Sequence, residues 1–476
     1  MKKKFTRDIS ANTFQVVINQ LAGLLIFYFC SKFLDKQTFG EINWSIALLI
    51  TAFNILGSGI DQVTVRKIAA GHSPDSLMRL YLLHVLFTGL IFYLCLLLGA
   101  LCFPGFFRTH TLLIALGISQ FFIFLSTPFK QVATGKEQFK TLLFMSTCSN
   151  IVKAIGVPLL VMTNHLTVRL VLAIFIAGAT VELILCAYLS KALLKKSAAV
   201  PFDRKNYREL IRESLPQLGS VIFNSAVARF DWILLGFIST AVVLAEYSFA
   251  YKIFELSTLP LLVLAPLLLP KFTRLFHDGS RPDLLAGDKG FMVLLRIEMI
   301  LSAFIALLLN MLWEPFVDQI TGGKYGRVNV TNIFILSACM PFLYMNNFLW
   351  TVNFAKGQLK RIFFIIMVTF GVNVAGDIVL IPFLQGRGAA IAYLAAIAGQ
   401  TVLYIGGTKI AHIHKAWQSM LLCSGAALAA GCLANRFFTD ALARVAISSI
   451  LYILLLVLAG QLRSSDWKTL KTTIGI

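Results

Sequence analysis

Long apolar runs, separated by short polar segments, repeat along the whole chain. A helical run of roughly 20 residues spans the ~30 Å hydrocarbon core of a bilayer. The pattern predicts fourteen such helices, at 12–34, 42–60, 80–103, 111–131, 142–162, 169–190, 216–237, 246–270, 291–313, 328–350, 362–384, 389–408, 418–437 and 443–461. The runs are continuously apolar rather than alternating, which excludes a β-barrel. We therefore predict an all-α polytopic membrane protein.

The composition also indicates a membrane protein. Of the 476 residues, 58% are hydrophobic and 13% are charged, and the mean hydropathy of +0.80 is far above that of soluble proteins. The net charge of +20 does not indicate a nucleic-acid partner, because the basic residues gather on alternate loops. If the N-terminus is cytoplasmic, most Lys and Arg lie on the cytoplasmic side. We expect a bacterial cytoplasmic (inner) membrane protein with both termini in the cytoplasm.

Cysteine and histidine give no sign of a metal site or a cofactor. The eight Cys lie within predicted helices without CxxC spacing, and the seven His are scattered. The predicted outer loops are short and leave no room for a soluble catalytic domain. We therefore expect no metal, no cofactor and no enzymatic activity.

The stretch 191–215 divides the chain. It breaks at Pro201 and continues as a basic amphipathic segment, which is typical of a helix on an anionic membrane surface. The division predicts an N-lobe of six helices at 1–190, a C-lobe of six helices at 216–408, and two further helices with a tail at 409–476. An even number of helices per lobe gives a parallel repeat about an axis along the membrane normal. Two such lobes predict a transporter that works by alternating access.

Charged side chains recur inside the predicted helices, where each costs about 2.5 to 3.5 kcal/mol near the bilayer centre. We expect these charges to line a hydrated cavity, and internal ion pairing is the alternative. The intramembrane charges are Lys153, Glu182, Arg229, Asp231, Lys252, Glu255, Arg296, Glu298 and Asp377. For Arg296 and Glu298, which lie near a predicted helix end, snorkelling to the surface is a further alternative.

The chemistry of these side chains indicates an anionic ligand. Arg229, Lys252, Lys153 and Arg296 are candidate anion-binding residues, since Arg and Lys suit phosphate groups. The acids Asp231, Glu255, Glu182 and Asp377 are candidates for the cavity wall or for ion coupling. Asn12, Gln15 and Asn19 form an uncharged polar face that suits sugar hydroxyls or helix packing. Together they favour an amphiphile with a phosphate link, a sugar head and a lipid tail.

Four segments carry a family resemblance: FGEINWSIAL at 39–48, GSGIDQVTVRKIA at 57–69, FDWILLGFISTAVVLAEYSFAYKI at 230–253 and PLLLPKFTRLF at 266–276. The chain resembles the polysaccharide-transporter (Wzx-type) branch of the multidrug, oligosaccharidyl-lipid and polysaccharide (MOP) flippase superfamily. The resemblance implies a MATE-like fold with a cationic central cavity. It adds Asp61 and Arg66 to the candidate site residues, and Asp231, Glu246 and Lys252 also match it.

The resemblance also implies a substrate and partners. The substrate would be an undecaprenyl-pyrophosphate-linked oligosaccharide, an O-antigen, capsule or exopolysaccharide repeat unit, moved from the cytoplasmic to the periplasmic leaflet. The implied partners are this lipid-linked oligosaccharide, membrane lipids, H+ or Na+ as the coupling ion, and a polymerase with other polysaccharide assembly proteins.

Three other functions stay open. A cation-coupled multidrug or metabolite exporter is disfavoured because the helix at 12–34 lacks the acid that drug-exporting relatives often carry. A lipid II flippase is disfavoured because the same helix lacks arginine. A membrane glycan polymerase would be expected to have a long outer loop, and none is predicted here.

Overall fold

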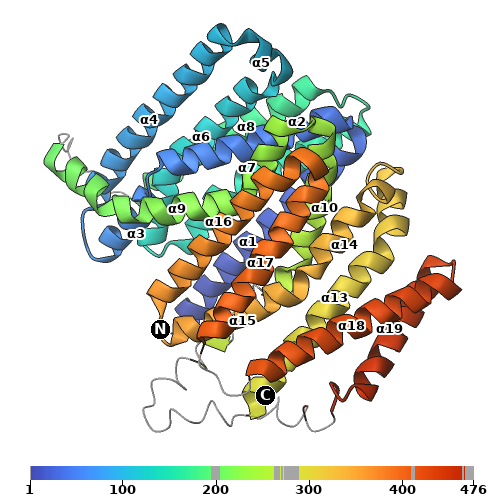
Figure 1. Ribbon diagram of the computed structural model, residues 1–476. Helices are drawn as coiled ribbons and strands as arrows, with labels where there is room; N and C mark the ends of the chain where they lie inside the picture. Colours follow the sequence, from blue (N-terminus) through green and yellow to red (C-terminus); the bar gives the residue numbers. More distant parts are fainter. Residues whose placement is uncertain are drawn as a thin grey trace, which may run out of the picture. The chain divides into compact units, whose positions relative to one another are not determined.

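The computed structural model describes residues 2–193, 204–261, 268–269, 272, 289–408, 413–463 and 466. Within these residues all regular structure is helical (Figure 1). The helices are α1 Lys2–Phe33, α2 Lys36–Leu56, α3 Ile60–Ala69, α4 Pro74–Cys102, α5 Pro104–Thr109, α6 Leu112–Gly135, α7 Phe139–Met162, α8 Val168–Ser190, α9 Arg204–Ile238, α10 Ala241–Ser257, α13 Lys289–Thr321, the 3₁₀ turn η1 Arg327–Asn329, α14 Val330–Ala338, α15 Met340–Ala355, α16 Leu359–Leu384, α17 Gly386–Gly407, α18 Ile413–Phe437 and α19 Ala441–Leu458. The prediction of an all-α fold is confirmed.

Twelve helical stretches in the described residues are long and apolar enough to cross a membrane. They coincide with all predicted spans except 216–237 and 246–270, which fall on α9 and on α10 with the residues after it. The predicted number of about fourteen is therefore approximate. Large apolar side chains such as Phe87, Leu101 and Phe383 are exposed, which suits contact with lipid.

Two predicted helices are interrupted. The predicted helix 42–60 ends as α2 at Leu56, and α3 starts at Ile60, because Ser58 and Gly59 adopt positive φ angles of 53° and 69°. The predicted helix 328–350 is divided into α14 and α15 at Cys339, just before Pro341. Proline lacks the N–H for the helical hydrogen bond and clashes with the preceding turn, which explains the break.

The segment before the seventh predicted span is helical where the structure describes it, and its place on the membrane surface stays a prediction. Its described part joins the span in α9, a single helix of 35 residues from Arg204 to Ile238 (Figure 1). The resemblance segment 266–276 lies largely outside the described residues.

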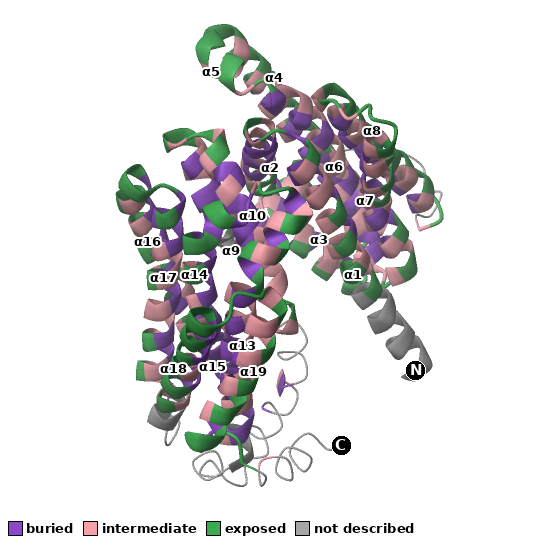
Figure 2. Cartoon of the chain, turned by 90° about the vertical axis from the view of Figure 1, so that its right-hand side faces the viewer, coloured by how far each residue is buried: buried purple, intermediate pink, exposed green. Residues whose placement is uncertain are grey.

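The chain forms two compact units, Met1–Ala245 and Glu246–Ile476. In the first unit α6 packs against α8, α7 against α1 and α8, and α2 against α6 and α9. In the second unit α16 packs against α17, and α13 packs against α14, α15, α18 and α19. Figure 2 shows that the buried residues lie on helix faces turned toward neighbouring helices. The lobe limits predicted from the sequence stay a prediction.

Close packing of α2 on α9 depends on Gly236. The Trp44 ring lies where a Cβ on Gly236 would be, and its Nε1 donates to the Ile233 carbonyl at 3.1 Å. Trp44 is almost fully buried, so its ring has little room to move.

We expect Gly236→Ala to lower the free energy of unfolding by about 1–3 kcal/mol through overpacking against Trp44. The measurement is the thermal unfolding midpoint of the detergent-solubilised protein. Gly219→Ala is the matched control on the same helix, since an added Cβ there meets no atom within 4 Å. A midpoint that is equally unchanged in both variants would contradict this account of the contact.

Candidate functional site

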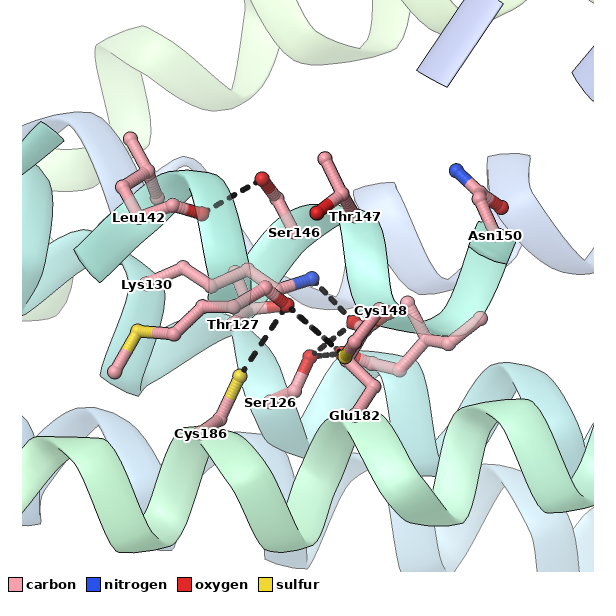
Figure 3. A network of polar contacts seen from close by, with 12 residues as sticks. Ser126, Thr127, Lys130, Leu142, Ser146, Thr147, Cys148, Asn150, Glu182 and Cys186 are labelled. Carbon is pink, nitrogen blue, oxygen red and sulfur yellow. Dashed lines mark hydrogen bonds and ion pairs between the residues drawn. The ribbon is translucent and has the colours of Figure 1, made fainter. Parts of the chain in front are cut away.

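Charged side chains from three helices meet inside the unit Met1–Ala245. Glu182 on α8 is 3% exposed and accepts a hydrogen bond from Ser126 Oγ on α6 at 2.8 Å. Its Oε1 also forms an ion pair with Lys130 Nζ, one helical turn after Ser126 (Figure 3). These bonds satisfy a carboxylate that would otherwise be very costly to bury. Glu182 is thus held by internal pairing here, and its role in ion coupling stays a prediction.

Lys153 on α7 adds a second positive charge to this cluster. Its side chain is 5% exposed, and its Nζ lies 5.0 Å from the centroid of the Phe175 ring. The ammonium group is within electrostatic range of both Glu182 and Lys130. Within the described part of the chain, however, Lys153 forms no ion pair. The cluster of Lys130, Lys153 and Glu182 therefore holds one buried cation, Lys153, one half-buried cation, Lys130, and one buried anion.

An amide pair lies one turn away from Lys153. Asn150 Nδ2 on α7 donates to Asn19 Oδ1 on α1 at 2.9 Å. Gln15, one turn before Asn19, has an enclosed Oε1 with no hydrogen-bond partner in the described structure. The Asn12 side chain lies outside the described residues. The α1–α7 interface thus supplies polar, uncharged groups near the cationic cluster.

Arg229 and Asp231 lie toward the end of α9. The Arg229 guanidinium is stacked on Trp232, with its Cζ 4.3 Å from the ring centroid. Asp231 is buried, and its Oδ1 accepts a hydrogen bond from the Trp232 backbone N–H at 2.8 Å. Asp231 is thus buried and Arg229 is half-buried, which lowers the cost that a fully lipid-facing charge would have.

Three other predicted cations have acidic partners. Lys252 Nζ lies 2.7 Å from Glu255 Oε2 within α10, and Arg296 Nη1 lies 3.2 Å from Asp466 Oδ2. Arg66 Nη2 on α3 lies 2.6 Å from Glu213 Oε2 on α9.

The Arg66 pair belongs to a cluster that joins α3 to α9. Lys67 Nζ lies 2.7 Å from Glu213 and 3.4 Å from Glu209. The hydrogen bond and charge of Lys67, with the charge of Arg66, lower the pKa of Glu213. Partial burial opposes a charged Lys67, yet its two acidic partners raise its pKa. The cluster is therefore fully charged at neutral pH and fixes the start of α9 on α3.

The remaining predicted acids lie apart from these clusters. Asp61, in the first turn of α3, is within electrostatic range of the buried Tyr81. Asp377 on α16 is fully buried and accepts a hydrogen bond from Asn373 Nδ2 at 2.6 Å. In the part of the chain that the structure describes, no three His, Cys, Asp or Glu side chains are placed to hold a metal ion.

Sequence reasoning missed Lys130 as a member of the site. Lys130 lies next to the last residue of the predicted helix 111–131, where a lysine is expected at the membrane surface. In the structure α6 continues to Gly135, so that Lys130 lies inside the helix. The signal that was present is its spacing of four residues from Ser126, which places both on one helix face.

Comparisons with known proteins agree with this architecture. Residues 5–276 match the family described as polysaccharide biosynthesis protein. The fold is similar to a lipid II flippase MurJ in an inward closed conformation, with 15% identity, a TM-score of 0.73, and coverage of 94% of this chain and 98% of that one. No curated protein matches the sequence.

Two further solved structures show the same fold. A multidrug resistance MATE family transporter in an inward-facing conformation has 13% identity and a TM-score of 0.65, over 87% of this chain and 98% of that one. A MOP superfamily transporter from Pyrococcus furiosus has 13% identity and a TM-score of 0.57, over 88% and 96%. The chain therefore shares its fold with these flippases and transporters, has twelve helical stretches in its described residues that can cross a membrane, and belongs to the polysaccharide biosynthesis protein family.

Proposed function

We propose that this protein is a flippase for an undecaprenyl-pyrophosphate-linked oligosaccharide, such as an O-antigen, capsule or exopolysaccharide repeat unit. It moves this substrate from the cytoplasmic to the periplasmic leaflet by alternating access. The observation that carries the proposal is the excess positive charge in the cluster of Lys130, Lys153 and Glu182, where Lys153 is buried without an ion-pair partner in the described residues. A pyrophosphate group supplies the missing negative charge. Membership of a polysaccharide biosynthesis family supports the glycan part.

Within this proposal, Lys153 is the first candidate to bind the headgroup. Its ammonium has no acidic partner within hydrogen-bonding distance in the described residues. An anion that binds Lys153 therefore does not have to displace a carboxylate first. Arg229 is the second candidate. Arg66, Lys252 and Arg296 are weaker candidates, because each already pairs with a carboxylate that an anion would have to displace.

The amides beside Lys153 suit the sugar part of the substrate. Asn150 donates a hydrogen bond to Asn19 across the α1–α7 interface, and Gln15 Oε1 accepts no hydrogen bond in the described structure. Amide groups can both donate to and accept from hydroxyl groups. We assign to these residues the contacts with the sugars nearest to the pyrophosphate.

The setting of the proposed reaction follows from the charge pattern of the sequence. The protein lies in the inner membrane with both termini in the cytoplasm. H+ or Na+ drives transport, with Asp231, Glu255 and Asp377 as candidate coupling residues. A polymerase and other assembly proteins would use the product on the periplasmic side.

A second candidate function is a cation-coupled exporter of drugs or metabolites. The observation that favours it is the burial of Asp231 and Asp377, since such carboxylates are suited to binding a coupling cation. An exporter of this kind would need no glycolipid substrate.

Deletion of the gene tests the proposal. We expect loss of surface polysaccharide and accumulation of its lipid-linked repeat unit in the cytoplasmic leaflet, and restoration of both by a plasmid-borne copy. Unchanged polysaccharide together with increased sensitivity to drugs would instead support the exporter. Accumulation of lipid II on depletion would support a lipid II flippase.

A further inference from the structure

Glu298 on α13 has a carboxyl group that the functions above do not use. Its side chain is 3% exposed, and both oxygens are enclosed without a hydrogen-bond partner in the described structure. Burying an unpaired carboxylate costs several kcal/mol of folding free energy, whereas burying the neutral acid costs far less. Buried polar groups without partners are rare in folded proteins, and each requires an explanation.

A second unpartnered group lies on α15, which packs against α13. Tyr344 on α15 is fully buried, and its hydroxyl is also enclosed without a hydrogen-bond partner among the described residues. The two side chains are within electrostatic range of each other. A tyrosine hydroxyl can donate a hydrogen bond to a carboxylate. Tyr344 is therefore suited to stabilise Glu298 once the proton has left.

The other titratable groups around Glu298 are already engaged or lie at a distance. On the same helix, Arg296 pairs with Asp466 at 3.2 Å. On α19, the Tyr452 hydroxyl donates to the Ile300 carbonyl at 2.9 Å. The segment of α14 has no titratable residue, and that of α15 has only Tyr344. On α18, Cys423 lies near Arg296. The other titratable groups of the two helices lie near the end of α18 and the start of α19, and they are Cys432, Arg436 and Arg444. The His414 and Lys415 side chains lie outside the described residues.

The break before α15 gives this contact a way to open. α14 ends at Ala338 and α15 begins at Met340, with Pro341 in its first turn. Tyr344 lies one turn after this break. Helix breaks at proline are places where one segment can change direction relative to the other. A movement of α15 at this point would expose Glu298 without unfolding α13.

We propose that Glu298, with Tyr344 on the neighbouring helix α15, is a proton-binding site of the unit Glu246–Ile476. The carboxyl holds its proton while α13 and α15 are closed on it, and it releases the proton to water when their contact opens. Proton binding is independent of the substrate. The use of this proton to drive transport rests on the proposed flippase function.

Infrared spectroscopy of the purified full-length protein tests proton binding. At neutral pH we expect the wild type to show the carbonyl band of a neutral carboxyl group, and we expect Glu298→Gln to lack this band. As the pH is raised, the wild type should lose the band and release about one proton. Glu314→Gln, at an exposed position on the same helix, is the matched control and should keep the band. The same band in Glu298→Gln, or a wild-type band that persists until the protein unfolds, would overturn the proposal.

Two further variants complete the test. Tyr344→Phe should move the loss of the band to higher pH, because the carboxylate loses its donor; an unchanged midpoint would overturn the pairing of the two residues. In the gene-deletion strain, Glu298→Gln should fail to restore surface polysaccharide while Glu314→Gln succeeds, and full restoration by both would overturn the coupling role. If the flippase function itself is wrong, deletion of the gene leaves surface polysaccharide unchanged, whereas the spectra are unaffected.

Discussion

Lys130→Met is expected to lower the free energy of unfolding by about 3–5 kcal/mol, the largest stability change we predict. The variant leaves Glu182 buried on α8 without its ion-pair partner, and neither the Ser126 hydrogen bond nor the more distant charge of Lys153 replaces that contact. The measurement is the thermal unfolding midpoint of the detergent-solubilised protein, compared with that of the wild type under the same conditions.

The double variant Lys130→Met, Glu182→Gln is the control for this prediction. Neutral residues of similar size remove both charges together, and such replacements are often neutral or stabilising. We expect the double variant to recover most of the lost stability. A single variant as stable as the wild type would show that the Lys130–Glu182 pair contributes nothing to the fold.

Lys153→Met is expected to abolish most transport while leaving stability unchanged or raised. Removing a buried cation that has no ion-pair partner in the described residues relieves a desolvation cost, so the fold does not suffer. Loss of its contact with an anionic headgroup costs about 2 kcal/mol or more, which corresponds to roughly 30-fold or greater loss of transport. The measurement is restoration of surface polysaccharide in the deletion strain, with the unfolding midpoint measured in parallel.

Lys140→Met is the matched control for this experiment, since Lys140 is exposed near the start of the same helix α7. It should restore polysaccharide fully. Full restoration by Lys153→Met would remove Lys153 from the substrate path. A fall in stability with no specific loss of transport would instead identify Lys153 as a structural residue.

The fold was predictable because membrane helices can be recognised in a sequence by their length and apolar composition. Twelve predicted spans coincide with helices that can cross a membrane, and their ends differ by only a few residues in most cases. The interruptions near Gly59 and Pro341 were not predicted, although both residues are visible breakers. A continuous apolar run conceals a local break, because hydropathy reports burial in lipid and not backbone angles.

The charge pairings were much less predictable than the helices. The sequence identifies Lys153 and Glu182 as costly intramembrane charges, but it does not show that α6 brings Lys130 into an ion pair with Glu182. Nor does it show that Arg296 pairs with Asp466, since 170 positions separate the two along the chain. Such contacts depend on how helices rotate and pack, and a hydropathy pattern fixes neither. Glu298 was attributed to snorkelling as readily as to function, whereas the structure buries it.

The unbroken course of α9 has a mechanical consequence. At 1.5 Å per residue, its 35 residues form a rod about 50 Å long. Near one end the rod is fastened to α3 by Glu213, and near the other Gly236 is pressed against Trp44 on α2. Pro216 lies between these two contacts, and proline inside a helix removes one backbone hydrogen bond and favours a bend. With both ends of α9 fastened, a change in the direction of the helix is therefore concentrated at Pro216.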